Sequence, residues 1–85
     1  MQTEHDKGYL TALGELGDTF ARLADQAQGE VTAAIGRALR ARADCDPAAE
    51  RRAETALHEA LALKIAWMKA LEVTMNAESR RRAAA

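Results

Sequence analysis

One strong break divides this 85-residue sequence into two halves of similar length. The break covers residues 43–47 and contains the only proline of the chain. Asp46 is a good helix N-cap, Pro47 is a preferred first helical residue, and proline disfavours helical geometry at the residue before it. One helix is therefore predicted to end near Arg42 and another to begin at Pro47. Because the connection is short, the two helices are predicted to form an antiparallel hairpin.

The second half contains the most apolar stretch, residues 57–75, which has neither glycine nor proline. At about 100° per residue, its large apolar side chains cover an arc of roughly 200°, and one of them lies beyond that arc. A single antiparallel partner helix cannot cover so much apolar surface. One side of the stretch is therefore predicted to form the hairpin core, with Leu57, Leu61, Ile65, Met68 and Met75. The other side is predicted to form a protein interface, with Leu63, Trp67, Leu71 and Val73.

The interface prediction centres on Trp67, because tryptophan is enriched at the centres of protein interfaces. All five glycines lie in the first half, and each costs about 1 kcal/mol in a helix interior relative to alanine. Residues 1–16 are therefore expected to be a flexible or frayed segment. Helix 1 is expected at about 17–42, the turn at 43–46, helix 2 at about 47–79, and a disordered basic and alanine-rich tail at 80–85. The predicted fold class is all-α, a coiled-coil-like, two-helix antiparallel hairpin that oligomerises.

The charge and apolar patterns argue against nucleic-acid binding and membrane insertion. The formal net charge is −1, and residues 80–82 form the only basic run, so no nucleic-acid partner is expected. No segment has 18 consecutive apolar residues, so no membrane span is expected, and the first residues do not resemble a cleavable signal peptide. The single cysteine, Cys45, fits a reducing compartment and is interpreted as a loop thiol.

Catalytic and metal-binding patterns are weak. His58 follows Glu54 by four residues, whereas helical di-metal sites use more carboxylates and a Glu-x-x-His spacing. No catalytic residue, metal or cofactor is therefore predicted. Lys64 is the one basic residue placed inward, and it keeps open a small all-helical enzyme of the chorismate-mutase type, a class that clamps a dicarboxylate with inward Arg and Lys. A homodimeric four-helix-bundle adaptor or regulatory protein is the other alternative.

Several short motifs point to a known family. They are Gly8-Tyr9-Leu10, Asp18-Thr19, Val31-Thr32, Asp46-Pro47-Ala48, Leu57 with Glu59, Leu63-Lys64, Leu71 and Val73. In these motifs the chain resembles the needle subunits of bacterial type III secretion systems. The resemblance implies a helical hairpin that is exported without a cleaved signal and assembles with other chains. The small helical-hairpin co-chaperones of the needle are also similar in length and turn position, and they better explain the polar residues 78–82.

The expected function is thus a non-enzymatic helical assembly protein, either needle-like or a small co-chaperone. Its expected partners are proteins, namely itself, other secretion components, or both. The expected location is the bacterial cytoplasm for a co-chaperone or adaptor, and outside the cell for a needle-like subunit.

Overall fold

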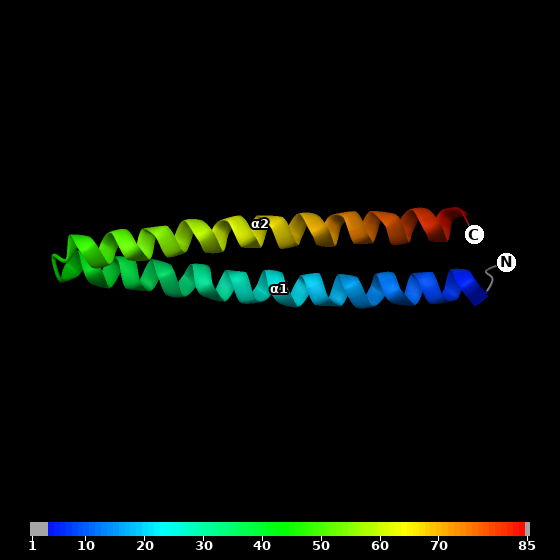
Figure 1. Cartoon of the computed structure of the whole chain (residues 1–85), viewed down its shortest axis with the longest axis horizontal. Helices are drawn as coiled ribbons and strands as arrows, with labels where there is room; N and C mark the ends of the chain where they lie inside the picture. The colour runs from blue at the N-terminus through cyan, green and yellow to red at the C-terminus, as the bar shows by residue number, and fades with distance from the viewer. Residues whose placement is uncertain (1–3, 85) are drawn as a thin grey trace.

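Two long helices make up the computed structural model, which describes residues 4–84. Helix α1 spans Glu4–Ala43 and helix α2 spans Pro47–Ala84. They lie side by side and run in opposite directions, which gives a rod with extents of 65 × 14 × 12 Å (Figure 1). The predicted all-α antiparallel hairpin is therefore confirmed.

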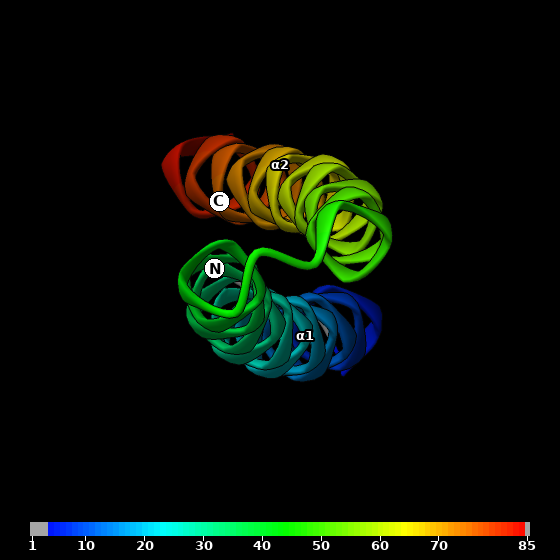
Figure 2. The ribbon, with the colours of Figure 1, turned by 90° about the vertical axis from the view of Figure 1, so that its left-hand side faces the viewer.

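The helices meet along a seam in which the spacing alternates between three and four residues, as in a coiled coil. A seven-residue repeat of this kind makes the two helices wind around each other, and Figure 2 shows them crossing when viewed from the turn. The buried and half-buried seam positions of α1 are Leu10, Leu13, Gly17, Phe20, Ala24, Ala27, Val31, Ala34, Ala38 and Ala41. Those of α2 are Glu50, Ala53, Leu57, Ala60, Lys64, Trp67, Leu71, Thr74 and Glu78.

The two ends of the seam are built differently. Near the turn it consists mainly of buried alanines, among which Ala34 is 0% exposed. Farther from the turn it contains aromatic rings. Phe20 and Trp67 stack with their ring centroids 5.8 Å apart and their planes inclined by 20°. The seam is thin, because no large side chain among the described residues is fully buried.

The predicted hairpin core was wrong for four of its five residues. Only Leu57 lies in the seam, whereas Leu61, Ile65, Met68 and Met75 are exposed. The prediction followed the largest side chains of one helix. The seam instead depends on both helices, and the alanine-lined side of α1 packs closely against the side of α2 that carries small residues at regular intervals.

The turn ends α1 with a Schellman motif. The N–H of Asp46 donates to the carbonyl of Ala41 at 2.9 Å, and the N–H of Cys45 donates to the carbonyl of Arg42 at 3.1 Å. Cys45 has a φ of 55°, in the left-handed region that this motif requires. These bonds satisfy carbonyl groups at the end of α1 that have no partner within the helix.

Helix α2 begins as the sequence predicts. Asp46 Oδ1 accepts a hydrogen bond from the N–H of Ala49 at 3.1 Å, which is N-cap geometry, and Pro47 is the first helical residue. An ion pair between Arg42 and Glu50, with 2.9 Å between Nη2 and Oε1, ties the two helices together beside the turn. The turn itself covers residues 44–46, since α1 continues to Ala43.

Replacing Cys45 by glycine is expected to raise the free energy of unfolding by about 0.5 to 1 kcal/mol, because glycine adopts a positive φ without steric cost. Urea denaturation followed by circular dichroism measures this change. Cys45→Ser is the matched control, because it keeps a Cβ at the same φ and should leave the midpoint unchanged. A Cys45→Gly midpoint at or below that of the wild type would contradict the account of the turn.

Both helices extend farther than predicted. Helix α1 already begins at Glu4 and α2 continues to Ala84, while residues 1–3 and 85 lie outside the described residues. The early glycines are tolerated because packing outweighs intrinsic propensity. Leu13 is buried in the seam, and the guanidinium carbon of Arg81 lies 5.4 Å from the centre of the Tyr9 ring. The C-terminal end of α2 is also supported by an ion pair between Arg82 and Glu78.

Candidate protein-interaction faces

Large apolar side chains are exposed on both sides of the seam. The first group, called the Met68 face here, consists of Leu61, Ile65, Met68 and Met75 of α2. At about 100° per residue, these four positions fall on one side of α2, roughly perpendicular to the direction of α1. Ile65 and Met68 are 56% and 51% exposed, so the face is open to another chain.

The second group, called the Leu63 face here, consists of Leu63 and Val73 of α2 and Leu16 of α1, all exposed. On α2 it lies on the side opposite to the Met68 face. Leu16 is assigned to this face through two other residues. Tyr9 of α1 and Ala77 of α2 line the same cleft, so they lie on the same side of the hairpin. Leu16 lies one seven-residue repeat after Tyr9, and Leu63 lies two such repeats before Ala77, so both share that side. The hairpin therefore presents apolar side chains in two opposite directions.

The surface area of the chain is large for its mass. The accessible surface is 6166 Å², whereas a compact 9.2-kDa protein would expose about 4,900 Å². The excess of roughly 1,200 Å² is as large as the surface buried in a small specific protein–protein interface. A long two-helix rod has this excess because each helix covers only one side of the other.

The charges around the two faces differ. Gln28 marks the α1 edge of the Met68 face, since its Oε1 accepts a hydrogen bond from Lys64 Nζ at 2.6 Å. Asp25 and Asp18 precede Gln28 on the same side of α1, and Glu72 of α2 lies between Met68 and Met75. Beside Ile65–Met75 the Met68 face is therefore bordered mainly by carboxylates, whereas nearer the turn the same side of α1 carries the exposed Ile35 and Leu39.

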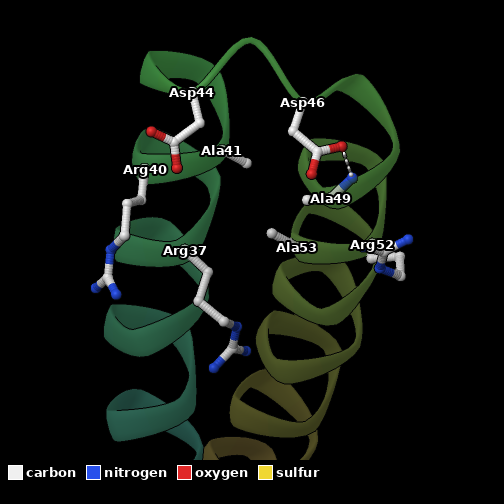
Figure 3. A pocket seen from close by; sticks show the side chains of 8 residues that line it. All are labelled: Arg37, Arg40, Ala41, Asp44, Asp46, Ala49, Arg52 and Ala53. Atoms are coloured by element: carbon white, nitrogen blue, oxygen red, sulfur yellow. Dashed lines mark hydrogen bonds between the residues drawn. The ribbon is translucent and has the colours of Figure 1, made fainter.

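The Leu63 face is bordered by arginines. At the turn end, Arg37, Arg40 and Arg52 surround a cleft of about 380 Å³ whose floor includes the buried Ala41 and Ala53 (Figure 3). The turn residues Asp44 and Asp46 also line this cleft, and Figure 3 shows the Asp46 carboxylate bonded to the backbone of α2. At the other end, Arg80 and Arg81 line the cleft that contains Tyr9.

Lys64 does not join the arginines. It is half-buried in the seam and donates its hydrogen bond to Gln28, and it is not among the residues that line the arginine cleft. The basic pocket around Lys64 that a dicarboxylate-binding enzyme would use is thus not assembled between the two helices of a single chain. Among the described residues, no three His, Cys, Asp or Glu side chains gather as metal ligands.

The structure places the predicted interface residues in two different environments. Trp67 and Leu71 are half-buried in the seam of the same chain, whereas Leu63 and Val73 are exposed. An interface at Leu63 and Val73 stays a prediction. Sequence reasoning missed Leu16 and the arginine cleft, although the alternating three- and four-residue spacing of alanines in α1 was a usable signal for the direction of the seam.

Within the described residues, neither helix contains a stretch apolar enough over sufficient length to cross a membrane. Comparison of the chain with known proteins finds no matching family, no matching curated protein and no matching solved structure.

Proposed function

We propose that this protein is a non-enzymatic helical assembly protein whose hairpin packs against other helical protein chains. The observation that carries the proposal is the exposure of large apolar side chains on two opposite faces, while the half of the seam near the turn is lined largely by alanine. Burying a large aliphatic side chain fully contributes about 1.5 to 3 kcal/mol. Association would therefore supply the apolar burial that the seam alone lacks.

The proposed biological setting is bacterial type III secretion, with a needle-like subunit and a small needle co-chaperone as the two forms. The hairpin and its Asp46-Pro47 turn suit both forms. The polar end of α2, with its ion pair between Arg82 and Glu78, suits a protein that stays in solution, and it favours the co-chaperone. The proposed location is then the bacterial cytoplasm, or the cell exterior for a needle-like subunit.

The proposal is tested by size-exclusion chromatography with light scattering, from low micromolar to submillimolar concentration. The expected result is a mass of at least twice the 9.2 kDa of one chain. Electron microscopy of the same samples separates the two forms, because filaments indicate a needle-like subunit and small closed particles indicate a co-chaperone or adaptor. A folded monomer at every concentration would overturn the proposal.

A pair of double variants shows whether the apolar faces are responsible. Leu63→Asp/Ile65→Asp places one charge on each face, and we expect it to be a helical monomer. The control Ala62→Asp/Asn76→Asp adds the same charge at exposed positions of α2 that point away from both faces and from α1, and it should associate like the wild type. Equal masses for the two double variants would contradict the role of the faces.

A further inference from the structure

We infer that the Met68 face binds a second copy of this chain, with α2 packed against α2 and the two turns at opposite ends of the dimer. The inference rests on the proposed assembly function and names the partner for one of its two faces. The Leu63 face is left free in such a dimer and is available to a different chain.

The Met68 face has the residue spacing of a second helix–helix seam. Leu61, Ile65 and Met68 follow one another at intervals of four and three residues, and Met75 lies seven residues farther along. The stretch from Leu61 to Met75 extends over about 21 Å at 1.5 Å per residue. Only Glu72 interrupts the apolar pattern, so the face can interdigitate with another helix over about four turns.

The relative orientation of the two copies is inferred from the residues that each possible arrangement would pack against the Met68 face. In a symmetric dimer that buries this face, the two-fold axis is either parallel to the helices (along them) or perpendicular to the helices (across them). With the axis along the helices, the Met68 face of one copy meets α1 of the other. At that level α1 carries Asp18 and Asp25, whereas its exposed Ile35 and Leu39 lie nearer the turn. Burying these carboxylates against apolar side chains is unfavourable. With the axis across the helices, the Met68 face meets itself.

The charges at the two ends of the face support the same arrangement. Glu54 lies 14 residues before Met68 and Arg82 lies 14 residues after it, on the same side of α2. A two-fold axis close to Met68 therefore brings Glu54 of one copy near Arg82 of the other, at both ends of the contact. Arg82 already binds Glu78, and its guanidinium keeps further N–H donors for a second carboxylate.

The elongated shape leaves surface for a partner. A stable interface of standard size buries about 800 Å² on each partner. Each hairpin exposes roughly 1,200 Å² more than a compact protein of its mass, and this excess is spread along the whole rod. The Met68 face is one part of that surface that carries large exposed apolar side chains at helix-packing spacing.

Disulfide cross-linking tests the arrangement, in a Cys45→Ser background that removes the only native thiol. Met68→Cys lies on the proposed axis, so it is expected to form a disulfide-linked dimer with its own copy under mild oxidation. Ile65→Cys lies three residues from the axis, about 9 Å from its own copy along the helices, and is expected to cross-link with itself far less. Leu61→Cys and Met75→Cys lie seven residues from Met68, which separates each from its own copy by about 20 Å, beyond disulfide reach. These two variants are expected to cross-link with each other when mixed.

Each pattern of cross-linking has a definite meaning. Equal self-cross-linking at all four positions would overturn the antiparallel orientation. No cross-linking at any of them, in variants that retain the wild-type dimer mass, would overturn the inference and leave the proposed assembly function standing. A wild-type protein that is monomeric at every concentration would overturn both.

A charge-reversal series gives a second, independent test that does not alter the apolar face. Glu54→Arg and Arg82→Glu are each expected to weaken dimerisation about two- to fivefold, and the combined variant is expected to restore it. Arg80→Glu is the matched control, because Arg80 lies on the side of the Leu63 face, and it should leave the dimer dissociation constant unchanged. If the loss of dimer affinity in the combined variant equalled the sum of the two single losses, the proposed contact between Glu54 and Arg82 would be overturned.

Discussion

Replacing Ala34 by aspartate is expected to lower the free energy of unfolding of the hairpin by about 3 to 5 kcal/mol. Among the residues that the structure describes, Ala34 is the least exposed, at 0%, and it lies in the alanine-lined half of the seam where α1 and α2 pack closely. An aspartate at this position has no room and no cationic partner, and an unpaired buried charge costs about 3 to 5 kcal/mol. A domain of this length has a total stability of about 4 to 13 kcal/mol, so this loss removes a large part of it.

The matched control is Ala33→Asp, which adds the same charge one residue away at an exposed position. Its helical signal and urea midpoint should stay close to those of the wild type. Far-ultraviolet circular dichroism and urea denaturation of both variants make the comparison. If Ala34→Asp retained the helical signal and midpoint of Ala33→Asp, the seam as described here would be wrong.

Replacing Trp67 by alanine is expected to lower the free energy of unfolding by about 2 to 3 kcal/mol. The range for buried aromatic residues is about 3 to 5 kcal/mol, and the smaller figure reflects the half-burial of Trp67. Part of the loss comes from the stacking contact with Phe20, since aromatic pairs contribute about 0.5 to 1.5 kcal/mol beyond their burial. Urea denaturation at fixed protein concentration measures the change, with Lys69→Ala as an exposed control on the same helix.

A double-mutant cycle with Phe20→Ala separates the seam role of Trp67 from a role between chains. The ring pair predicts a coupling energy of about 0.5 to 1.5 kcal/mol that does not depend on protein concentration. If Trp67 were instead the anchor of an interface with a second chain, the coupling to Phe20 would vanish and the destabilisation would depend on concentration. That outcome would restore the interface role that the sequence suggests for Trp67.

The hairpin was predictable because its signals are local. Asp46 and Pro47 together specify the end of one helix and the start of the next, and the structure shows the N-cap bond and the helix start at these residues. The left-handed conformation of Cys45 was not predictable in the same way. Glycine usually marks that position, and here the Schellman motif forms without it.

The side of α2 that faces α1 was not predictable from α2 alone. Large apolar residues surround much of that helix, so its own pattern allows several faces to turn inward. The deciding information lies in α1, where alanines such as Ala27, Ala34 and Ala41 mark a narrow seam. The Met68 face was therefore recognised as apolar in the sequence but assigned to the wrong neighbour.

The helical ends depend on contacts between residues far apart in the sequence. The propensity cost of Gly8 and Gly14 predicts a frayed start, whereas Tyr9 lies against Arg81 at the far end of the chain. No local pattern indicates such a contact. The helical period placed Leu63 and Val73 outside the hairpin core, and both are exposed, whereas Trp67 and Leu71, which were grouped with them, lie in the seam.

The uneven seam has a consequence for the order in which the hairpin folds. Pairs beside the turn, such as Arg42 and Glu50, close short loops, whereas Phe20 and Trp67 are 47 positions apart in sequence. Loop-closure entropy increases with loop length, so pairing is expected to start at the alanine-rich end and to proceed away from the turn. The aromatic stack is then expected to form after the rate-limiting step. On this account, substitutions near the turn should change mainly the folding rate, and substitutions in the ring pair should change mainly the unfolding rate.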